Sequence, residues 1–178
     1  EKETRRYVYR LSFDQMDVKK SNKFFQDVSW WNNIDLGCVP GDANYLYPVS
    51  SKEAEFGYIF DFSGASYRPV AVTVRDRFFS IQDGVSCQSF VSEDGVNWQP
   101  VTGLAYRAGM SSIKGNTVRL LLNEGGKLPD RVYYKAVFKI SDGTFKGIGN
   151  QWNRIHVSEA DKNDSLCFQC DFELEPVK

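Results

Sequence analysis

Apolar and polar residues alternate along most of this chain. Near its start, Tyr7, Tyr9, Leu11 and Phe13 occupy every second place. The same spacing returns in residues 56–62, 70–74, 118–122, 132–140 and 166–174. A period of two is typical of β-strands with one face on a core and the other toward solvent. The pattern therefore predicts an all-β chain.

Turn sequences separate the predicted strands, and Asp-Gly pairs occur at residues 83–84, 94–95 and 142–143. Glycine adopts positive φ without a Cβ clash and Asp tolerates the left-handed region, so such a pair between two strand-like runs predicts a hairpin. The whole pattern predicts about eight to ten strands in an antiparallel sandwich. We expect residues 14–29 to form a loop with a helical turn. We expect residues 30–44 to form an irregular region.

The chain has 178 residues and a formal net charge of −1 at pH 7. This length suits one domain over residues 1–178, and the balanced charge gives no long-range field to attract nucleic acid or an anionic membrane. No apolar stretch reaches the roughly 18 residues that span a bilayer, so we expect no transmembrane segment. The first residue is Glu1 rather than Met, from which we expect a processed chain or a piece of a longer one.

The central turn has a distinctive amino-acid sequence. Residues 92–98 read Ser-Glu-Asp-Gly-Val-Asn-Trp and lie between two apolar runs, with Trp98 leading the returning strand. The pattern Ser-x-Asp-Gly-x-x-Trp resembles the central hairpin of discoidin, or coagulation-factor C-type, domains. These domains are a branch of the galactose-binding-like β-sandwiches, which include many carbohydrate-binding modules. Residues 58–64 also resemble that family's aromatic-led strand ending in Asp-Leu-Gly, with Phe62-Ser63 replacing the Leu.

The resemblance implies an antiparallel β-sandwich of the galactose-binding-like jelly-roll type. Its discoidin-like core would cover about residues 55–140, with extra N- and C-terminal segments on either side. In the resembling modules, ligands usually bind in loops at one end of the sandwich. A structural calcium ion is also common among them, and residues 35–44 offer several oxygen donors for one, although without a spaced Asp-x-Asp pattern.

Catalytic chemistry finds little support in the sequence. His156 is the one histidine, so every Ser-His-Asp or Cys-His scheme would need it, and zinc sites built mainly from imidazole are excluded by count. Residues 147–149 lack the third glycine and the helix of a phosphate-binding loop. With 23 acidic residues, a facing pair of carboxylates of the glycosidase kind stays open. We therefore assign no catalytic residue.

Four cysteines raise the question of a metal or redox site. Cys167 and Cys170 have the spacing for either, but residues 166–174 alternate as a strand, on which positions three apart face opposite ways. We therefore predict that Cys170 lies in the core and that Cys167 faces outward. A disulfide such as Cys38 to Cys87 stays open if the protein is exported.

Binding chemistry is better represented, because aromatic residues make up 15% of the chain. Adjacent rings on an extended segment face opposite ways, so Trp30-Trp31 and Phe78-Phe79 each put at least one ring outside unless they fold over the core in a loop. The C–H face of a sugar stacks on such rings, while Asn, Gln, Asp and Arg bond its hydroxyls. Tryptophan is also common in cores. The candidate ligand-binding residues are Trp30, Trp31, Asn32, Arg75, Arg77, Phe78, Gln151, Trp152, Asn153, Arg154 and His156.

These observations favour a non-catalytic carbohydrate-binding module that recognises a glycan through loop aromatics and polar side chains. We expect it to be attached to, or to work beside, a glycan-processing protein, outside the cell or at its surface. Two alternatives stay open. The first is a discoidin-type domain that binds a protein or a lipid headgroup through exposed rings, and the second is a glycan-active sandwich enzyme with two carboxylates about 5 to 10 Å apart.

Overall fold

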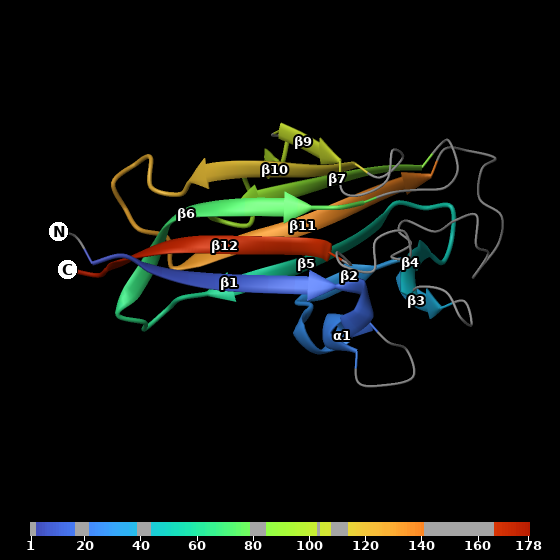
Figure 1. The fold of residues 1–178 in the computed structure, drawn as a ribbon, viewed down its shortest axis with the longest axis horizontal. Coiled ribbons are helices and arrows are strands. Elements are labelled where there is room, and N and C mark those ends of the chain that lie inside the picture. Colours follow the sequence, from blue (N-terminus) through green and yellow to red (C-terminus); the bar gives the residue numbers. More distant parts are fainter. Residues whose placement is uncertain are drawn as a thin grey trace.

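The computed structural model describes residues 3–16, 22–38, 44–78, 85–102, 104–107, 114–140 and 166–178. Within these residues the chain forms twelve strands, one α-helix and one short 3-10 helix (Figure 1). It is an all-β sandwich, as the alternating pattern predicts. The predicted turns at residues 83–84 and 142–143 and the predicted strand at residues 154–157 lie outside the described residues.

The first sheet has five antiparallel strands, and the last strand of the chain lies second in it. The order is β1 (Arg5–Ser12), β12 (Leu166–Pro176), β6 (Tyr67–Asp76), β10 (Lys114–Leu121) and β9 (Leu104–Arg107). Residues near the two ends of the chain are therefore neighbours, with Arg5 opposite Leu174. Figure 1 shows both termini at the same end of the sandwich.

The second sheet also has five antiparallel strands, and it carries the candidate site. The order is β2 (Trp30–Asn32), β5 (Ala54–Asp61), β11 (Arg131–Ile140), β7 (Val85–Ser92) and β8 (Gln99–Pro100). The turn after β5 confirms the signal at Ser63-Gly64, because Gly64 adopts a φ of 74°. That turn takes the chain from β5 in this sheet to β6 in the other.

The region predicted as irregular is more ordered than expected. Residues of β3 (Ile34–Cys38) and β4 (Asn44–Pro48) pair antiparallel in a small separate sheet. Pattern analysis missed β4 because Tyr45, Leu46 and Tyr47 are all buried, so no polar residue alternates with them. Before this hairpin stand the 3-10 helix (Phe13–Met16) and α1 (Lys23–Asp27), the latter matching the expected helical turn. None of the described helices is long and apolar enough to cross a membrane.

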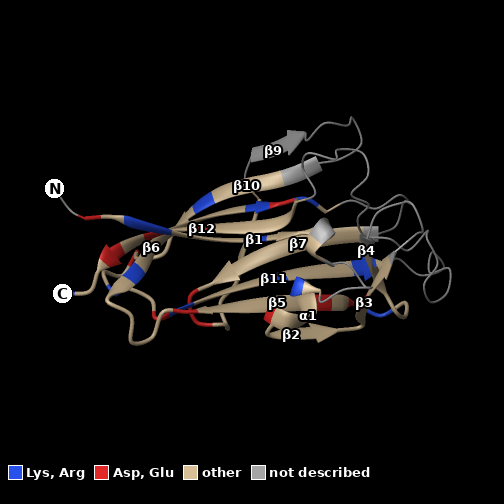
Figure 2. Cartoon of the chain, turned by 60° about the horizontal axis from the view of Figure 1, so that its bottom comes forward, with Lys and Arg blue, Asp and Glu red and all other residues tan. Residues whose placement is uncertain are grey.

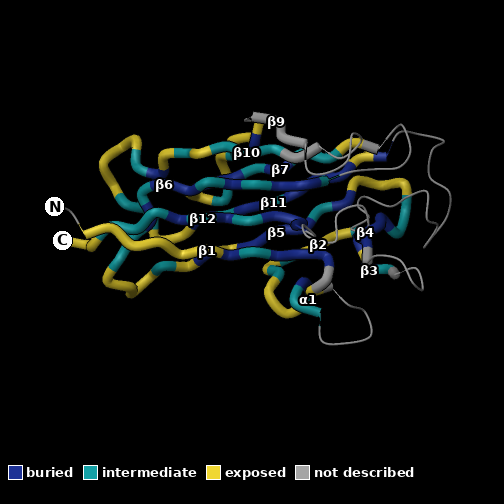
Figure 3. The backbone as a smooth tube through the Cα atoms, in the orientation of Figure 1, coloured by how far each residue is buried: buried dark blue, intermediate teal, exposed yellow. Residues whose placement is uncertain are grey.

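The core lies between the two five-stranded sheets and is rich in aromatic rings. Inward positions of β5 and β11 meet those of β12 and β6, and the rings of Tyr134 and Phe168 stack at 4.2 Å between centroids. Phe60 meets Phe172 edge-on at 5.0 Å. Figure 3 shows burial along the middle of these strands and exposure at the turns near the termini. The alternation therefore leaves each sheet one outer face, and those two faces differ.

Both cysteines of β12 are buried, which corrects the predicted outward position of Cys167. Leu11 pairs with Phe168 and Ser12 with Leu166, so Cys167 is an extra residue in the ladder, which is a β-bulge. The bulge interrupts the period of two on which the prediction rested. Cys87 is a free thiol in the structure, as are the two β12 cysteines.

Candidate functional site

The turn between β7 and β8 is tied together by its own side chains. The Asp94 carboxylate accepts hydrogen bonds from the backbone N–H groups of Asn97 and Val96 at 2.7 and 2.8 Å, and Ser92 Oγ accepts one from Gly95 at 2.9 Å. Gly95 has a φ of 75°, which glycine adopts without strain. The Asn97 and Val96 donors hold the pKa of Asp94 well below its ordinary value. The predicted turn is confirmed, and it delivers Trp98 to the start of β8.

Trp30 covers the outer surface of the second sheet from the edge strand β2. Its partner in the ladder is Gly57 of β5, where a Cβ would fall 2.0 Å from Trp30 Cζ2. The missing side chain is what admits the indole against the strand. Trp30 Nε1 also donates a hydrogen bond to Glu55 Oε1 at 2.7 Å. Gly57 and Glu55 together fix the position of this ring.

Trp98 reaches the same place from the opposite edge of the sheet. Its ring centroid lies 6.5 Å from that of Trp30 and 6.5 Å from that of Tyr133, edge-on to both. Lys135 Nζ lies 4.3 Å from the Trp98 ring centroid and 5.6 Å from that of Phe90, a cation–π arrangement. One row of ladder partners crosses the sheet and contains Trp30, Gly57, Lys135, Phe90 and Pro100.

Two tryptophans from opposite edges therefore meet above the central strands β5 and β11. We call this surface the ring face, and we define it by seven outward residues. They are Trp30, Glu55, Gln88, Phe90, Trp98, Tyr133 and Lys135.

A hollow of about 590 Å³, here the face hollow, opens beside these rings. Its lining combines Phe90 and Trp98 with the amide of Gln88. Its charges are paired, because Lys135 Nζ lies 3.6 Å from Glu55 Oε2 and Lys139 Nζ lies 3.3 Å from Glu53 Oε2. Figure 2 shows Lys, Arg, Asp and Glu scattered along the described strands. The face hollow therefore offers rings, hydrogen-bonding groups and compensated charge.

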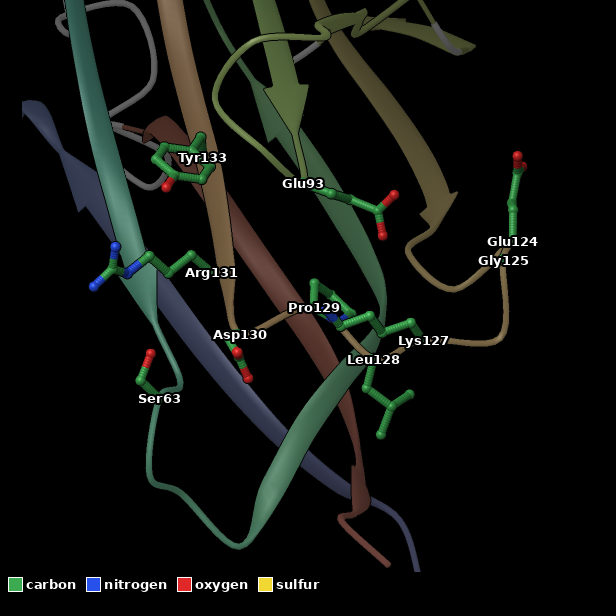
Figure 4. A pocket seen from close by; sticks show the side chains of 10 residues that line it. All are labelled: Ser63, Glu93, Glu124, Gly125, Lys127, Leu128, Pro129, Asp130, Arg131 and Tyr133. Atoms are coloured by element: carbon green, nitrogen blue, oxygen red, sulfur yellow. The ribbon is translucent and has the colours of Figure 1, made fainter.

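A second hollow of about 650 Å³, here the end hollow, lies at the end of the sandwich near the termini (Figure 4). Tyr133 and Arg131 line it from β11, Glu93 from the end of β7, and Glu124 and Lys127 from the loop after β10. Arg131 Nε lies 3.0 Å from Asp61 Oδ2, so its charge is already paired. Burial raises the pKa of Glu93, and repulsion from Glu124 and Asp94 raises it further.

The structure separates the two predicted tryptophans. Trp30 and the exposed Asn32 occupy outward positions of β2, opposite Gly57 and Glu55. Trp31 is 51% exposed, but it stands opposite Phe56 and meets Phe25 edge-on at 5.3 Å, away from the row of the ring face. Alternation had implied that the two rings face opposite ways, and they do.

The predicted Arg75, Arg77 and Phe78 cluster is not part of the ring face. Arg75 lies on β6 in the other sheet, opposite Thr117 and Gln169. Arg77 is fully buried, and Phe78 packs inward against Phe138 at 5.3 Å between centroids. The rings of Phe78 and Phe79 were expected to divide between inside and outside. Phe78 is the inward one, and Phe79 lies outside the described residues, as do the candidates Gln151, Trp152, Asn153, Arg154 and His156.

Metal chemistry was left unassigned, and the suggested calcium loop lies partly outside the described residues. In the part of the chain that the structure describes, no three His, Cys, Asp or Glu side chains are grouped to hold a metal ion. Asp94, the most strongly bonded carboxylate of the central turn, is engaged by the backbone donors of its own loop.

Of the seven residues of the ring face, only Trp30 was among the predicted ligand-binding residues. The six that sequence reasoning missed are Glu55, Gln88, Phe90, Trp98, Tyr133 and Lys135. The alternation that puts Tyr133 and Lys135 on the same side of a strand was visible in the sequence. The cross-strand register that gathers them was not visible. A further signal was Gly57, a glycine within an aromatic-rich strand, since such a position often marks a close approach by another group.

Sequence comparison finds no protein-family model and no curated protein that matches this chain. The solved structures that align with it include the following three. TmCBM27, a carbohydrate-binding module studied for specific mannan recognition, is 11% identical with a TM-score of 0.36, and the alignment covers 98% of this chain and 99% of that one. TmCBM61, solved with β-1,4-galactotriose, is 8% identical with a TM-score of 0.37, covering 87% and 93%.

The third is a Bacillus thuringiensis Cry1Da tryptic core variant, which is 11% identical with a TM-score of 0.35. The alignment covers 83% of this chain but only 21% of the Cry1Da chain. All three TM-scores lie below 0.5, so the likenesses carry no inference about a ligand. The discoidin resemblance stays a prediction, and the function has to be inferred from the site itself.

Proposed function

We propose that this chain is a non-catalytic carbohydrate-binding module that binds a glycan on its ring face. The proposal changes the predicted location from end loops to the face of a sheet. It keeps residues 1–178 as one domain of the galactose-binding-like type, working with a glycan-processing protein outside the cell or at its surface. Trp30 remains in the proposed site, and Asn32 lies beside it opposite Glu55. Trp31, Arg75, Arg77 and Phe78 are not part of the site.

One observation carries the proposal, which is the meeting of Trp30 and Trp98 over polar side chains. The ring centroids of Trp30 and Trp98 are 6.5 Å apart. Glu55 and Lys135 lie beside these rings and form an ion pair at 3.6 Å. A sugar presents an apolar C–H face that stacks on an indole and hydroxyls that need directional partners. Carboxylate, ammonium and amide groups beside the rings supply those partners.

The same geometry weighs against the alternative of a protein- or lipid-binding patch. Such a patch would be a continuous apolar area, whereas the face hollow is lined by Glu55, Gln88 and Lys135 between its rings. The alternative of a glycan-active enzyme finds one feature in its favour, because Glu93 and Glu124 both line the end hollow.

The adjacent tryptophans provide a matched test of the proposal. The wild-type chain is screened on a glycan array, and affinity for each hit is measured by calorimetry. Trp30→Ala should weaken binding about tenfold, equivalent to about 1.4 kcal/mol, since it removes a stacking ring. Trp31→Ala is the control, because the ring of Trp31 lies off the ring face. This variant should bind as the wild type does.

Urea unfolding of both variants checks that each remains folded. Equal losses in the two variants would place the ligand elsewhere. A wild-type chain that binds no glycan would overturn the proposal, and release of new reducing ends from a hit would favour the enzyme alternative.

A further inference from the structure

The two hollows meet along one strand. The outward residues of β11, taken in order, are Arg131, Tyr133, Lys135, Val137 and Lys139. The last three line the face hollow, and the first two line the end hollow. Consecutive outward positions of one strand are neighbours on one surface. The two hollows are therefore adjacent along β11, with no other strand between them.

The boundary between the hollows is a pair of rings. Trp98 lines the face hollow, Tyr133 lines the end hollow, and their centroids are 6.5 Å apart. Tyr133 itself rests against Gly95, where a Cβ would come within 3.2 Å of Tyr133 Cε1. The hairpin that places Trp98 therefore also supports Tyr133. A ligand that stacks on one ring has the second ring beside it.

The length of this surface is much greater than a single sugar. From Arg131 to Lys139 the strand extends roughly 27 Å, at about 3.3 to 3.4 Å for each residue. The volumes are comparable at both ends, about 590 and about 650 Å³. A monosaccharide would leave one hollow empty, whereas a chain of sugars laid along β11 would occupy both.

The charges along the surface select against an anionic chain. Lys135, Lys139 and Arg131 each lie within 3.6 Å of a carboxylate oxygen of Glu55, Glu53 or Asp61. The end hollow adds Glu93 and Glu124 against one lysine, Lys127. Carboxylate or sulfate groups on a ligand would face these acidic residues without an unpaired cation cluster to hold them.

We propose that the end hollow is a second subsite of the same site, and that the ligand is an uncharged linear glycan running along β11 through both hollows. This inference rests on the proposed function. Trp98 and Tyr133 stack against sugars near the junction, and Glu93 accepts hydrogen bonds from hydroxyls in the end hollow.

The test is a length series of neutral oligosaccharides prepared from a glycan that the wild-type chain binds. Affinity should rise about tenfold or more from the shortest binding fragment to one that spans both hollows, and should then stay constant. Glu93→Ala should abolish most of this gain and leave the affinity for the shortest fragment unchanged. Trp98→Ala should weaken binding of every fragment, and Glu173→Ala, a matched change on the other sheet, should alter none.

A monosaccharide that binds as tightly as the longest fragment would overturn the second subsite while leaving the proposed function intact. A length dependence that is unchanged in Glu93→Ala would overturn the second subsite in the same way. A polyuronate that binds as well as the neutral series would overturn the inference that the ligand is uncharged. A chain that binds no glycan of any length would overturn both proposals.

Discussion

The outer faces of the two large sheets carry different chemistry on the same alternating pattern. On the first sheet, outward positions of β1, β12 and β10 hold ion pairs, including Arg6 with Asp171 and Arg119 with Glu173. Ten outward positions of this sheet form a surface that we call the ion-pair face, and none of them holds an aromatic ring. They are Arg6, Val8, Arg10, Thr73, Arg75, Thr117, Arg119, Gln169, Asp171 and Glu173. On the second sheet, Trp30, Phe90, Tyr133 and Gly57 occupy outward positions, and the ring of Trp98 joins them from the turn before β8.

The difference shows what each face requires of its residues. Exposed ion pairs keep a sheet soluble and tolerate substitution, since each contributes little to stability. Rings on an outer face need a specific place to lie, which Gly57 provides for Trp30 and the β7–β8 turn provides for Trp98. We therefore expect the ring face to be sensitive to small changes that the ion-pair face would absorb.

The largest expected effect is that of Gly57→Ala. The new Cβ would lie 2.0 to 2.3 Å from three indole atoms of Trp30, so the ring must move from the position in which it bonds Glu55. We expect a loss of about 1 to 3 kcal/mol in the free energy of unfolding, the usual range for overpacking. Urea denaturation followed by tryptophan fluorescence measures it.

Gly125→Ala is the matched control, because a Cβ there meets nothing within 4 Å. Its stability should stay within a few tenths of a kcal/mol of the wild type, or rise slightly as the unfolded chain loses freedom. If the two alanine variants were equally stable, the close packing of Trp30 on β5 would be refuted.

An intermediate effect is expected from Asp94→Asn, which should make the turn between β7 and β8 insensitive to acid. The folded-state pKa of Asp94 is lowered by the Asn97 and Val96 donors. A lowered pKa adds stability above the ordinary value of about 3.9, and this stability is lost as pH falls below it. The wild type should therefore be more stable than Asp94→Asn at neutral pH. The difference between their free energies of unfolding, here the stability gap, should narrow between about pH 4 and pH 2.

Unfolding by urea at a series of pH values measures the gap. The pKa of Glu173 is also lowered, first by its hydrogen bond with Arg119 and then by that residue's charge, so Glu173→Gln is a useful companion. Salt should shrink the Glu173 contribution more than that of Asp94, whose partners are mainly backbone N–H groups. A gap for Asp94→Asn that is constant across pH would contradict the assigned role.

The smallest expected effect lies on the ion-pair face. Arg119 Nη2 lies 2.8 Å from Glu173 Oε2, but both side chains are nearly half exposed. Solvent screening limits such a pair to about 0.2 to 1 kcal/mol, and we expect the low end. A double-mutant cycle with Arg119→Ala and Glu173→Ala gives the coupling energy. A coupling as large as the Gly57→Ala effect would erase the contrast between the two faces.

Local patterns were sufficient to predict the long strands of the two large sheets and the central turn, but not the short strands β2, β3 and β4. Alternation located β1, β5, β6, β11 and β12, and the Asp94-Gly95 pair located the β7–β8 turn, because these features depend on neighbours in the sequence. The placement of Trp98 could not be predicted in this way. Its partners Trp30, Lys135 and Tyr133 come from other strands, and only the ladder register brings them together.

Two side chains point in directions that the sequence pattern did not indicate. Cys167 was predicted to face outward because an unbroken period of two was assumed, and a bulge opposite β1 interrupts it. Phe78 was named with Arg75 and Arg77 as a candidate ligand-binding residue, and the structure places its ring against Phe138 of the opposite sheet. In both cases a contact distant in sequence decided which way a side chain points.

The position of β12 also bears on how the protein can be made. This strand lies between β1 and β6, so the first sheet stays split until residues 166–176 have been synthesised. Until then β1 lacks its ladder partner, and the inner rings of β5 and β11 lack those of Phe168 and Phe172. Long-range pairing of this kind is slow and leaves strand edges exposed. A nascent chain of this sequence would therefore hold open edges during translation and would depend on prompt arrival of its final strand to avoid aggregation.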